Sequence, residues 1–120
     1  MNQELEEGIR LFNTQKYFEA HEALEVVWLK AQGEEKEFLH GLIQIAAAFH
    51  HHSRGNSAGF RSLLEKGATK LNAFGDSRDG LDLARFRKQL QPWQNFQLGV
   101  LPTQIPTLPP LPRIETTCPD

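Results

Sequence analysis

The sequence predicts an all-α protein, a compact bundle of about five helices followed by an extended, proline-rich C-terminal arm. All seven prolines lie at or beyond position 92, so the first 91 residues are free to form helices. Apolar residues there recur at the spacing of one helix face, and the strict alternation typical of strands is absent. A chain of 120 residues is long enough for one core. We therefore expect a single helical domain over residues 1–101 and an arm over residues 102–120.

The first two helices are expected over residues 3–12 and 16–32. The inner face of the first helix carries three apolar side chains: Leu5, Ile9 and Phe12. Asn13 and Thr14 lie just before the second helix. Their side-chain oxygens can accept hydrogen bonds from free backbone N–H groups at a helix start, so we expect them to cap this helix.

A third helix is expected over residues 34–54, after Gly33. Its first turn is rich in glutamate, which the positive end of the helix dipole favours. Its apolar positions cover most of its circumference: Phe38, Leu42, Ile45 and Phe49, with Ala46 and Ala48 beside them. We expect the middle of this helix to be buried nearly all round. So small a chain does not easily cover such a helix alone, which favours a homodimer.

A fourth helix, residues 57–74, is expected to follow Asn56 as its cap and to end at Gly75. Its inner face carries five apolar residues: Phe60, Leu63, Leu64, Leu71 and Phe74. A fifth helix is expected to begin at a cap formed by Asp79 and to end before Pro92. Its inner face carries Leu83, Phe86 and Leu90.

The arm is rich in proline, leucine and isoleucine. Prolines at positions 102, 106, 109, 110 and 112 exclude a helix and predict an extended chain. A free disordered tail is normally poorer in leucine and isoleucine. We therefore expect the arm to lie along the bundle or along a neighbouring subunit.

Composition excludes several classes of function. Hydrophobic residues make up 39% and charged residues 23% of the chain, as in ordinary globular proteins. A net charge of −2 and the absence of a basic stripe argue against a nucleic-acid partner. No apolar run is long enough to span a membrane, and the acidic N-terminus is unlike a signal peptide. The lone Cys118 excludes an intramolecular disulfide and a cysteine-based zinc site, so a reducing cytoplasm is expected.

The most informative residues are His21 and Glu25, in the second helix. A period of 3.6 residues puts them on the same stripe as three residues expected to be buried: Tyr17, Leu24 and Trp28. Burying an imidazole and a carboxylate costs several kcal/mol unless they are paired or bound. At i and i+4 the two side chains can interact directly. A hydrogen bond from one imidazole nitrogen to the carboxylate fixes the tautomer and leaves the other nitrogen available to a different partner.

Three interpretations of this pair are open. It can be a structural hydrogen-bond network, which predicts no cleft above it. It can be a metal site, with His21 and Glu25 binding one divalent ion such as zinc, manganese or iron. It can be a metal-free acid–base or small-ligand pocket. The third helix offers Gln44 or His51 as a further partner, and Tyr17 and Trp28 can add a hydroxyl and an indole N–H.

Two sequence blocks carry a resemblance to a known family. The first comprises Phe12-Asn13 and residues 17–22, with Glu25 and Trp28 at fixed spacing after His21. The second comprises residues 38–48, His50-His51 and Gly55-Asn56. Together they resemble the bacterial and archaeal family known as domain of unknown function 309, over roughly residues 8–71. The resemblance implies a compact helical domain whose hallmark residues cluster around the second and third helices. It brings no established activity.

We conclude from the sequence that the chain is a non-catalytic binding or assembly module. Its centre is expected to be a cluster between the second and third helices: His21, Glu25, Trp28, Tyr17, Gln44 and His51. The alternative is a metal-dependent hydrolase with His21 and Glu25 as ligands, completed by His51 or Gln44. The expected partner is a second copy, an unidentified small molecule or another protein, and neither nucleic acid nor a membrane.

Overall fold

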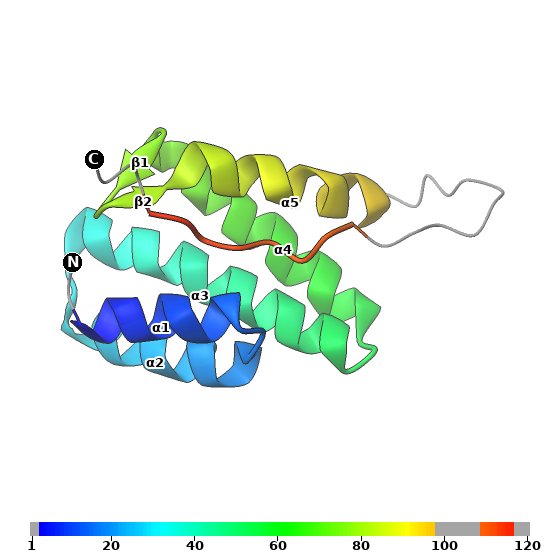
Figure 1. The fold of residues 1–120 in the computed structure, drawn as a ribbon, viewed down its shortest axis with the longest axis horizontal. Coiled ribbons are helices and arrows are strands. Elements are labelled where there is room, and N and C mark those ends of the chain that lie inside the picture. Colours follow the sequence, from blue (N-terminus) through cyan, green and yellow to red (C-terminus); the bar gives the residue numbers. More distant parts are fainter. Residues whose placement is uncertain (1–2, 98–108, 117–120) are drawn as a thin grey trace, which may run out of the picture.

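Five α-helices follow one another through residues 3–97, which the computed structural model describes together with residues 109–116. They are α1 (Gln3–Asn13), α2 (Tyr17–Lys30), α3 (Gly33–Ser53), α4 (Ser57–Leu71) and α5 (Leu83–Gln97). A 3₁₀ turn (Asn72–Phe74) and a hairpin of β1 (Ser77–Arg78) and β2 (Leu81–Asp82) separate α4 from α5. Short loops join the first four helices, so neighbours run antiparallel (Figure 1). The predicted all-α bundle is confirmed.

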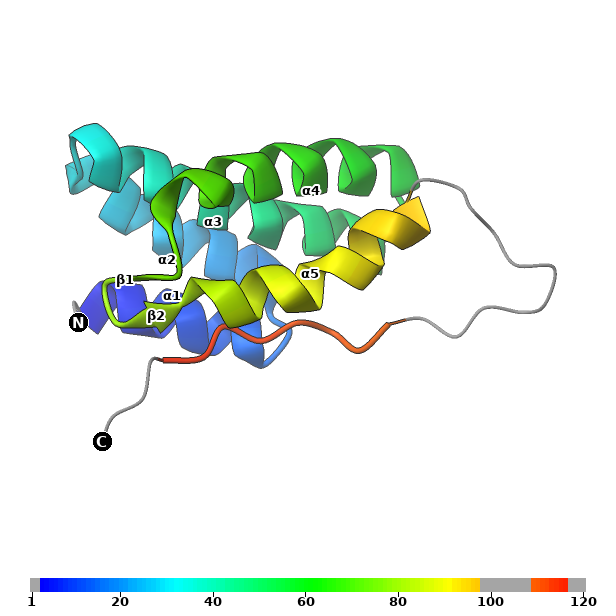
Figure 2. The same cartoon turned by 90° about the horizontal axis from the view of Figure 1, so that it is seen from above.

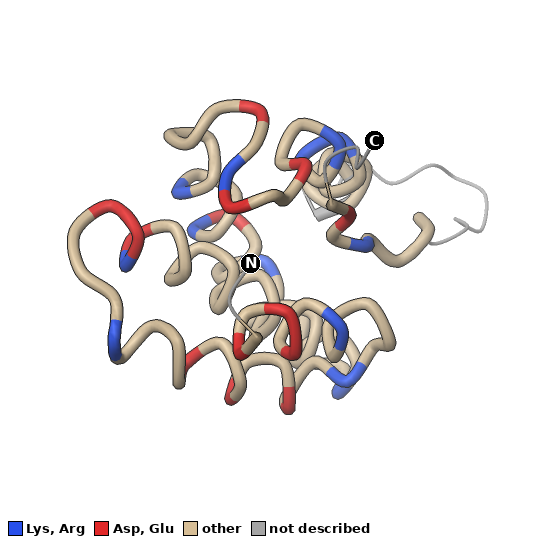
Figure 3. The backbone as a smooth tube through the Cα atoms, turned by 60° about the vertical axis from the view of Figure 1, so that its left-hand side comes forward, with Lys and Arg blue, Asp and Glu red and all other residues tan. Residues whose placement is uncertain are grey.

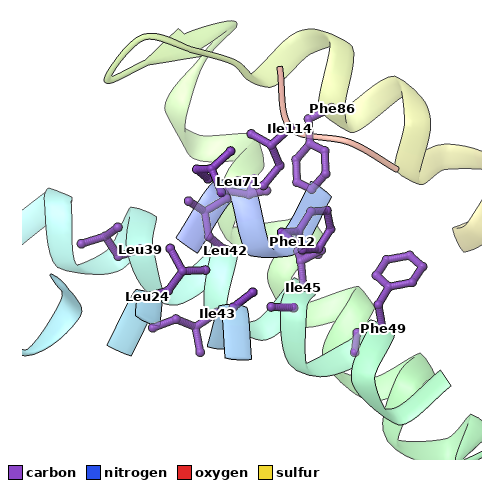
Figure 4. Packing of buried hydrophobic residues seen from close by; sticks show 14 of the residues in the cluster. Phe12, Leu24, Leu39, Leu42, Ile43, Ile45, Phe49, Leu71, Phe86 and Ile114 are labelled. Carbon is purple, nitrogen blue, oxygen red and sulfur yellow. The ribbon is translucent and has the colours of Figure 1, made fainter. Parts of the chain in front are cut away.

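Helix α3 packs against α2 on one side and α4 on the other. Nine of its residues are buried: Phe38, Leu39, Gly41, Leu42, Ile43, Ile45, Ala46, Ala48 and Phe49. Figure 4 shows several of them meeting Leu24 of α2, Phe12 of α1 and Leu71 of α4. The predicted burial of α3 is confirmed. Because the chain's own helices cover α3, its apolar character does not require a second copy.

Close packing of α3 on α4 depends on two glycines that face each other. A Cβ atom at Gly67 would lie 2.7 Å from Ile45 Cδ1 and 2.9 Å from the carbonyl oxygen of Gly41. Real Cβ atoms do not approach other heavy atoms this closely, so a side chain at Gly67 would push the helices apart. This close approach helps to bring α4 near enough to α2 and α3 to share a groove with them.

The start of α2 differs from the prediction. Lys16, and not Asn13 or Thr14, is the residue before the helix, and its side chain makes no capping hydrogen bond. The Thr14 hydroxyl instead donates to the carbonyl oxygens of Arg10 and Leu11, at 3.0 and 3.2 Å. The Asn13 amide binds the backbone of Ile114. Asn56, by contrast, caps α4 as predicted, because its side chain accepts from the Gly59 N–H at 2.9 Å.

The segment before α5 is a hairpin, so the predicted cap at Asp79 is wrong. Asp79 and Gly80 have positive φ angles of 53° and 80°, as a two-residue hairpin turn requires, and Asp-Gly is a favoured pair there. Asp82 caps α5 instead, because its carboxylate accepts from the Arg85 N–H at 2.9 Å.

Helix α5 runs through Pro92 to Gln97, so the predicted end before Pro92 is also wrong. Proline removes one helix hydrogen bond and usually breaks a helix at a cost of about 3 kcal/mol. Trp93, the next residue, is fully buried against the rings of Phe49, Phe60 and His52. The contacts of that side chain hold the turn around Pro92 in helical form.

The described part of the arm lies along its own bundle, beside α5 (Figures 1 and 2). The Asn13 amide both donates to and accepts from the Ile114 backbone, at 2.9 and 2.7 Å. Gln89 does the same with the Arg113 backbone, at 3.0 and 2.8 Å. Trp93 Nε1 donates to the Pro110 carbonyl oxygen at 2.9 Å. The Ile114 side chain enters the core next to Phe86 (Figure 4).

Within residues 3–97 and 109–116, no helix is long and apolar enough to cross a membrane. Cys118 and residues 102–108 of the arm lie outside the described residues.

A candidate ligand groove between α2, α3 and α4

A groove of about 340 Å³ opens where α2, α3 and α4 meet. Three helices supply its lining: His21, Glu25 and Trp28 from α2, His40, Ile43, Gln44 and Ala47 from α3, and Leu63 from α4. The structure thus gathers around one groove four of the residues that the sequence singled out. A purely structural network predicts no cleft above His21, and that expectation is wrong.

His21 and Glu25 are not buried as the sequence predicted. The buried face of α2 consists of Tyr17, Ala20, Leu24 and Val27, and its centre lies about 80° around the helix from His21. His21 and Trp28 are therefore half-buried, and Glu25 is exposed. The predicted stripe was displaced around the helix because it left out Ala20 and Val27. The structure places His21 at the edge of the core, where it lines the groove.

The imidazole and the carboxylate lie close without a hydrogen bond. His21 Nε2 is 3.8 Å from Glu25 Oε2, beyond the range of a direct bond. The Glu25 side chain is 49% exposed, so water screens the attraction between the two groups. Glu25 therefore does not fix the orientation of the ring, and its oxygens remain open to another donor.

Trp28 forms an aromatic wall at one end of the groove. Its ring lies 6.0 Å from the ring of His40, and the ammonium group of Lys36 stands over the indole, 4.3 Å from its centroid. A cation at this distance is attracted by the negative face of the ring. The indole of Trp28 is therefore already in contact with one positive charge.

Two residues of the groove carry polar atoms that are buried and have no hydrogen-bond partner among the described residues: His21 Nδ1 and Gln44 Oε1. Native proteins leave few such atoms unpaired, because each costs about 1–3 kcal/mol. Their position beside an open groove indicates that a bound group can supply the missing hydrogen bonds.

Tyr17 lies in the aromatic core and not in the groove. Its ring packs against Phe12 and Phe49, with centroids 5.2 and 5.6 Å away, and its hydroxyl is buried with no hydrogen-bond partner in the described part of the chain. Loss of water around the hydroxyl raises the pKa of Tyr17 to about 12.

Replacing Tyr17 with phenylalanine is expected to remove a loss of stability at alkaline pH. A tyrosine ionises near pH 10 in the unfolded chain and near pH 12 in the folded protein, so between these values only the unfolded state releases the proton. The free energy of unfolding then falls with rising pH, by on the order of 2 kcal/mol, and is unaffected below about pH 10. Denaturant titrations of both proteins across this range measure the difference. Near-ultraviolet absorbance follows the single tyrosine directly, and ionisation near pH 10 in the native protein would contradict its burial.

His51 is also absent from the lining of the groove. It lies at the end of α3, where the Asn56 side-chain amide is 3.2 Å from His51 Nδ1. The ligand set predicted for a metal ion therefore loses its histidine from the third helix. Among the residues that the structure describes, no three or more His, Cys, Asp or Glu side chains are grouped to hold a metal ion.

Three residues that shape the groove lie outside the cluster that the sequence predicted: His40, Ile43 and Leu63. The spacing of α3 puts His40 on the same polar stripe as Gln44, which makes it a possible partner of His21 and Glu25 from the sequence alone. Leu63 could not have been found this way, because only the packing of α4 on α3 brings it to the groove.

A larger cavity of about 790 Å³ lies at the start of α3. Two of its three basic side chains have acidic partners: Lys70 Nζ is 2.6 Å from Glu37 Oε1, and Arg78 Nη2 is 3.0 Å from Glu35 Oε1. The third, Lys36, stands over the indole of Trp28. Among the described residues, no side chain that lines this cavity has a buried polar atom without a hydrogen-bond partner. The groove at His21 is therefore the stronger candidate for a binding site.

Two relatives of this chain are described as uncharacterised proteins. The YpuF protein of Bacillus subtilis (strain 168) is 36% identical over 81 residues, which cover 65% of this chain and 47% of the relative. A protein of Aquifex aeolicus (strain VF5) is 31% identical over 88 residues, which cover 72% of this chain and 26% of the relative. The chain thus spans about half the length of the first and about a quarter of the second.

Residues 5–63 match the family described as Domain of unknown function (DUF309). This segment extends from α1 into α4 and contains every residue that lines the groove. The matched segment and the groove therefore coincide in the sequence, and the chain belongs to the DUF309 family.

Proposed function

We propose that this domain is a non-catalytic binding module whose groove receives a positively charged, hydrogen-bond-donating group. That group can belong to a small molecule or to a side chain of a protein partner. The observation that carries the proposal is the combination, in one groove, of an apolar wall with buried polar atoms that have no hydrogen-bond partner within residues 3–97 and 109–116.

The unpaired oxygens define the ligand's polar end. The Glu25 carboxylate is exposed and makes no hydrogen bond to His21, and Gln44 Oε1 is buried with no donor among the residues that the structure describes. Both are acceptors, so the group that fits them donates hydrogen bonds and carries positive charge. An ammonium or a guanidinium group has this chemistry.

The rest of the groove suits the methylene chain of such a ligand. Trp28, Ile43 and Leu63 offer apolar surface beside the acceptors. The contact of Lys36 with Trp28 within this same chain is an example of how an alkyl ammonium group packs on that indole. A ligand resembling a lysine or arginine side chain therefore matches both parts of the groove.

Binding is favoured over catalysis by what surrounds the imidazole. A general base is usually oriented by a hydrogen bond from a third group, whereas Glu25 stands 3.8 Å from the His21 ring. Among the described residues, no serine, threonine, cysteine or lysine lines the groove to act as a nucleophile. A metal-dependent hydrolase needs a third ligand beside His21 and Glu25, and His51, the histidine that the sequence offered for this role, does not line the groove.

The proposal is tested by titrating the protein with N-acetyl-arginine amide and N-acetyl-lysine amide, with neutral N-acetyl-norleucine amide as the control. The chain has two tryptophans, and their indole N–H signals in an NMR spectrum report on different places. Trp28 lines the groove, whereas Trp93 is buried and bonded to Pro110. We expect the cationic probes to move the Trp28 signal and leave the Trp93 signal in place. Equal shifts with the neutral probe, or none with any probe, would refute the proposal.

Replacing Gln44 with methionine is expected to raise the free energy of unfolding by about 1 kcal/mol and to weaken binding of the cationic probes. The substitution keeps the length of the side chain and removes a buried oxygen that lacks a partner, so the folded state no longer bears its desolvation cost. The bound probe loses the acceptor that it needs. Denaturant unfolding and the Trp28 titration measure the two effects.

Gln89→Met is the matched control, because the Gln89 amide makes two hydrogen bonds to the Arg113 backbone. The same chemical change should there lower stability and leave probe binding unchanged. If Gln44→Met lowered stability as Gln89→Met does, the Gln44 amide would be a satisfied structural group and the groove would lose its acceptor.

A further inference from the structure

The outer face of α2 points away from the core and carries an unusual set of side chains. We define the outer α2 face by five residues: Phe18, Glu19, Glu22, Val26 and Leu29. They lie within about 60° of one direction on the helix, opposite its buried side. None of them lines the groove.

The outer α2 face concentrates the exposed apolar surface of the protein. Phe18 is 49%, Val26 43% and Leu29 69% exposed, and these are all of the large exposed hydrophobic residues in the described part of the chain. Single exposed apolar residues are common, but three on one helix face form a patch of the kind that marks an interaction surface. Phe18 and Leu29 are eleven residues apart, about 16 Å along the helix axis.

Acidic side chains stand among these apolar residues. Glu19 and Glu22 are exposed, and neither has an ion pair among the described residues. Residues 3–30 as a whole hold six carboxylates and three basic side chains, although the net charge of the entire chain is only −2. Figure 3 shows many of the red, acidic positions in the part of the tube near the N-terminus. The patch is therefore both apolar and negatively charged.

We propose that the outer α2 face is a docking surface for a basic amphipathic helix of a partner protein. An amphipathic helix presents apolar side chains at the i, i+4 and i+7 spacing that would meet Phe18, Val26 and Leu29, with lysines or arginines beside them to meet Glu19 and Glu22. Opposite charges steer such a partner and fix its orientation.

Other occupants fit less well because of charge. An anionic lipid surface or a nucleic acid would be repelled by Glu19 and Glu22. A second copy joined by a two-fold axis would place the same acidic face against itself, which costs energy through like-charge repulsion. A cationic partner is the one that gains from both features of the face.

The test uses the full chain and a fluorescent peptide as long as α2, 14 residues, built from leucine and lysine to form an amphipathic helix. Two control peptides have the same leucines permuted around the helix, or glutamate in place of lysine. Fluorescence anisotropy at low and at high salt measures binding. We expect the basic amphipathic peptide alone to bind, more weakly at high salt. We also expect Glu19→Lys with Glu22→Lys to raise its Kd at least about tenfold.

The matched control is Glu6→Lys with Glu65→Lys, which changes the net charge equally at exposed positions outside this face. It should change the Kd much less than the α2 variant. The proposal is overturned if the two variants weaken binding equally or if the permuted peptide binds as well. It is also overturned if the protein forms a dimer that Leu29→Asp dissociates, since the occupant is then a second copy. Unaltered binding in the Gln44→Met protein separates this surface from the groove.

Discussion

Replacing Phe49 with alanine is expected to lower the free energy of unfolding by about 3–5 kcal/mol. Phe49 of α3 is fully buried and touches aromatic rings from every other helix of the described bundle. Its centroid lies 6.2 Å from Phe12 of α1, 5.6 Å from Tyr17 of α2, 5.1 Å from Phe60 of α4 and 5.2 Å from Trp93 of α5. Because five helices meet at this ring, no single helix can move in to fill the space that alanine would leave.

Denaturant unfolding measures the loss, with Phe18→Ala as the control. Phe18 is 49% exposed and contacts the rings of His21 and His50, so its removal should cost well under half as much. Domains of this size are stable by only about 5–15 kcal/mol, so a loss of this size is enough to leave part of the Phe49→Ala protein unfolded. Phe49→Leu then provides a folded variant, with an expected cost of about 1–2 kcal/mol. Equal losses at positions 49 and 18 would contradict the central role of Phe49.

The sequence predicted those parts of the fold that depend on local spacing. The apolar positions of α3 and the cap at Asn56 follow from residues within a few positions of one another, and the structure has both. The places where prediction was wrong depend on distant contacts. Pro92 lies within α5 because Trp93 packs against α3 and α4. Asn13 does not cap α2 because its amide binds Ile114, 101 residues away.

The rotation of α2 about its own axis explains how much of the groove could be predicted. The sequence identified His21, Glu25, Trp28 and Gln44 as unusual polar or aromatic residues on two neighbouring helices, and the structure places all four around one groove. The burial predicted for His21 and Glu25 was wrong, because a rotation of one helix by less than a quarter turn moves a residue from the core to its edge. Leu63 enters the groove only through the tertiary contact of α4 with α3, which no local pattern reveals.

The arm joins these observations, because its composition predicted contact and only the structure shows with what. Leucine and isoleucine among the prolines indicated that the segment would be covered. In the described residues it lies between α5 and the end of α1, held by the amides of Asn13 and Gln89. Its anchor in the core is Ile114, which is 2% exposed.

Ile114→Ala is therefore expected to lower the free energy of unfolding by about 2–4 kcal/mol and to loosen the arm. The alanine loses most of the apolar contact that offsets the entropy of ordering an extended segment. Once the arm leaves the bundle, the Trp93 N–H loses the Pro110 oxygen, so faster exchange of the Trp93 indole proton should accompany the loss of stability. Denaturant unfolding and hydrogen exchange measure the two effects.

Arg113→Ala is the control for the arm, because its side chain is 55% exposed while its backbone keeps both bonds to Gln89. It should change stability by less than about 1 kcal/mol and leave the exchange of the Trp93 proton unaltered. If Ile114→Ala behaved like Arg113→Ala, the arm would not be anchored through the core. If instead stability fell while Trp93 remained protected, Ile114 would fill space in the core without holding the arm, and the hydrogen bonds of Asn13 and Gln89 alone would account for docking.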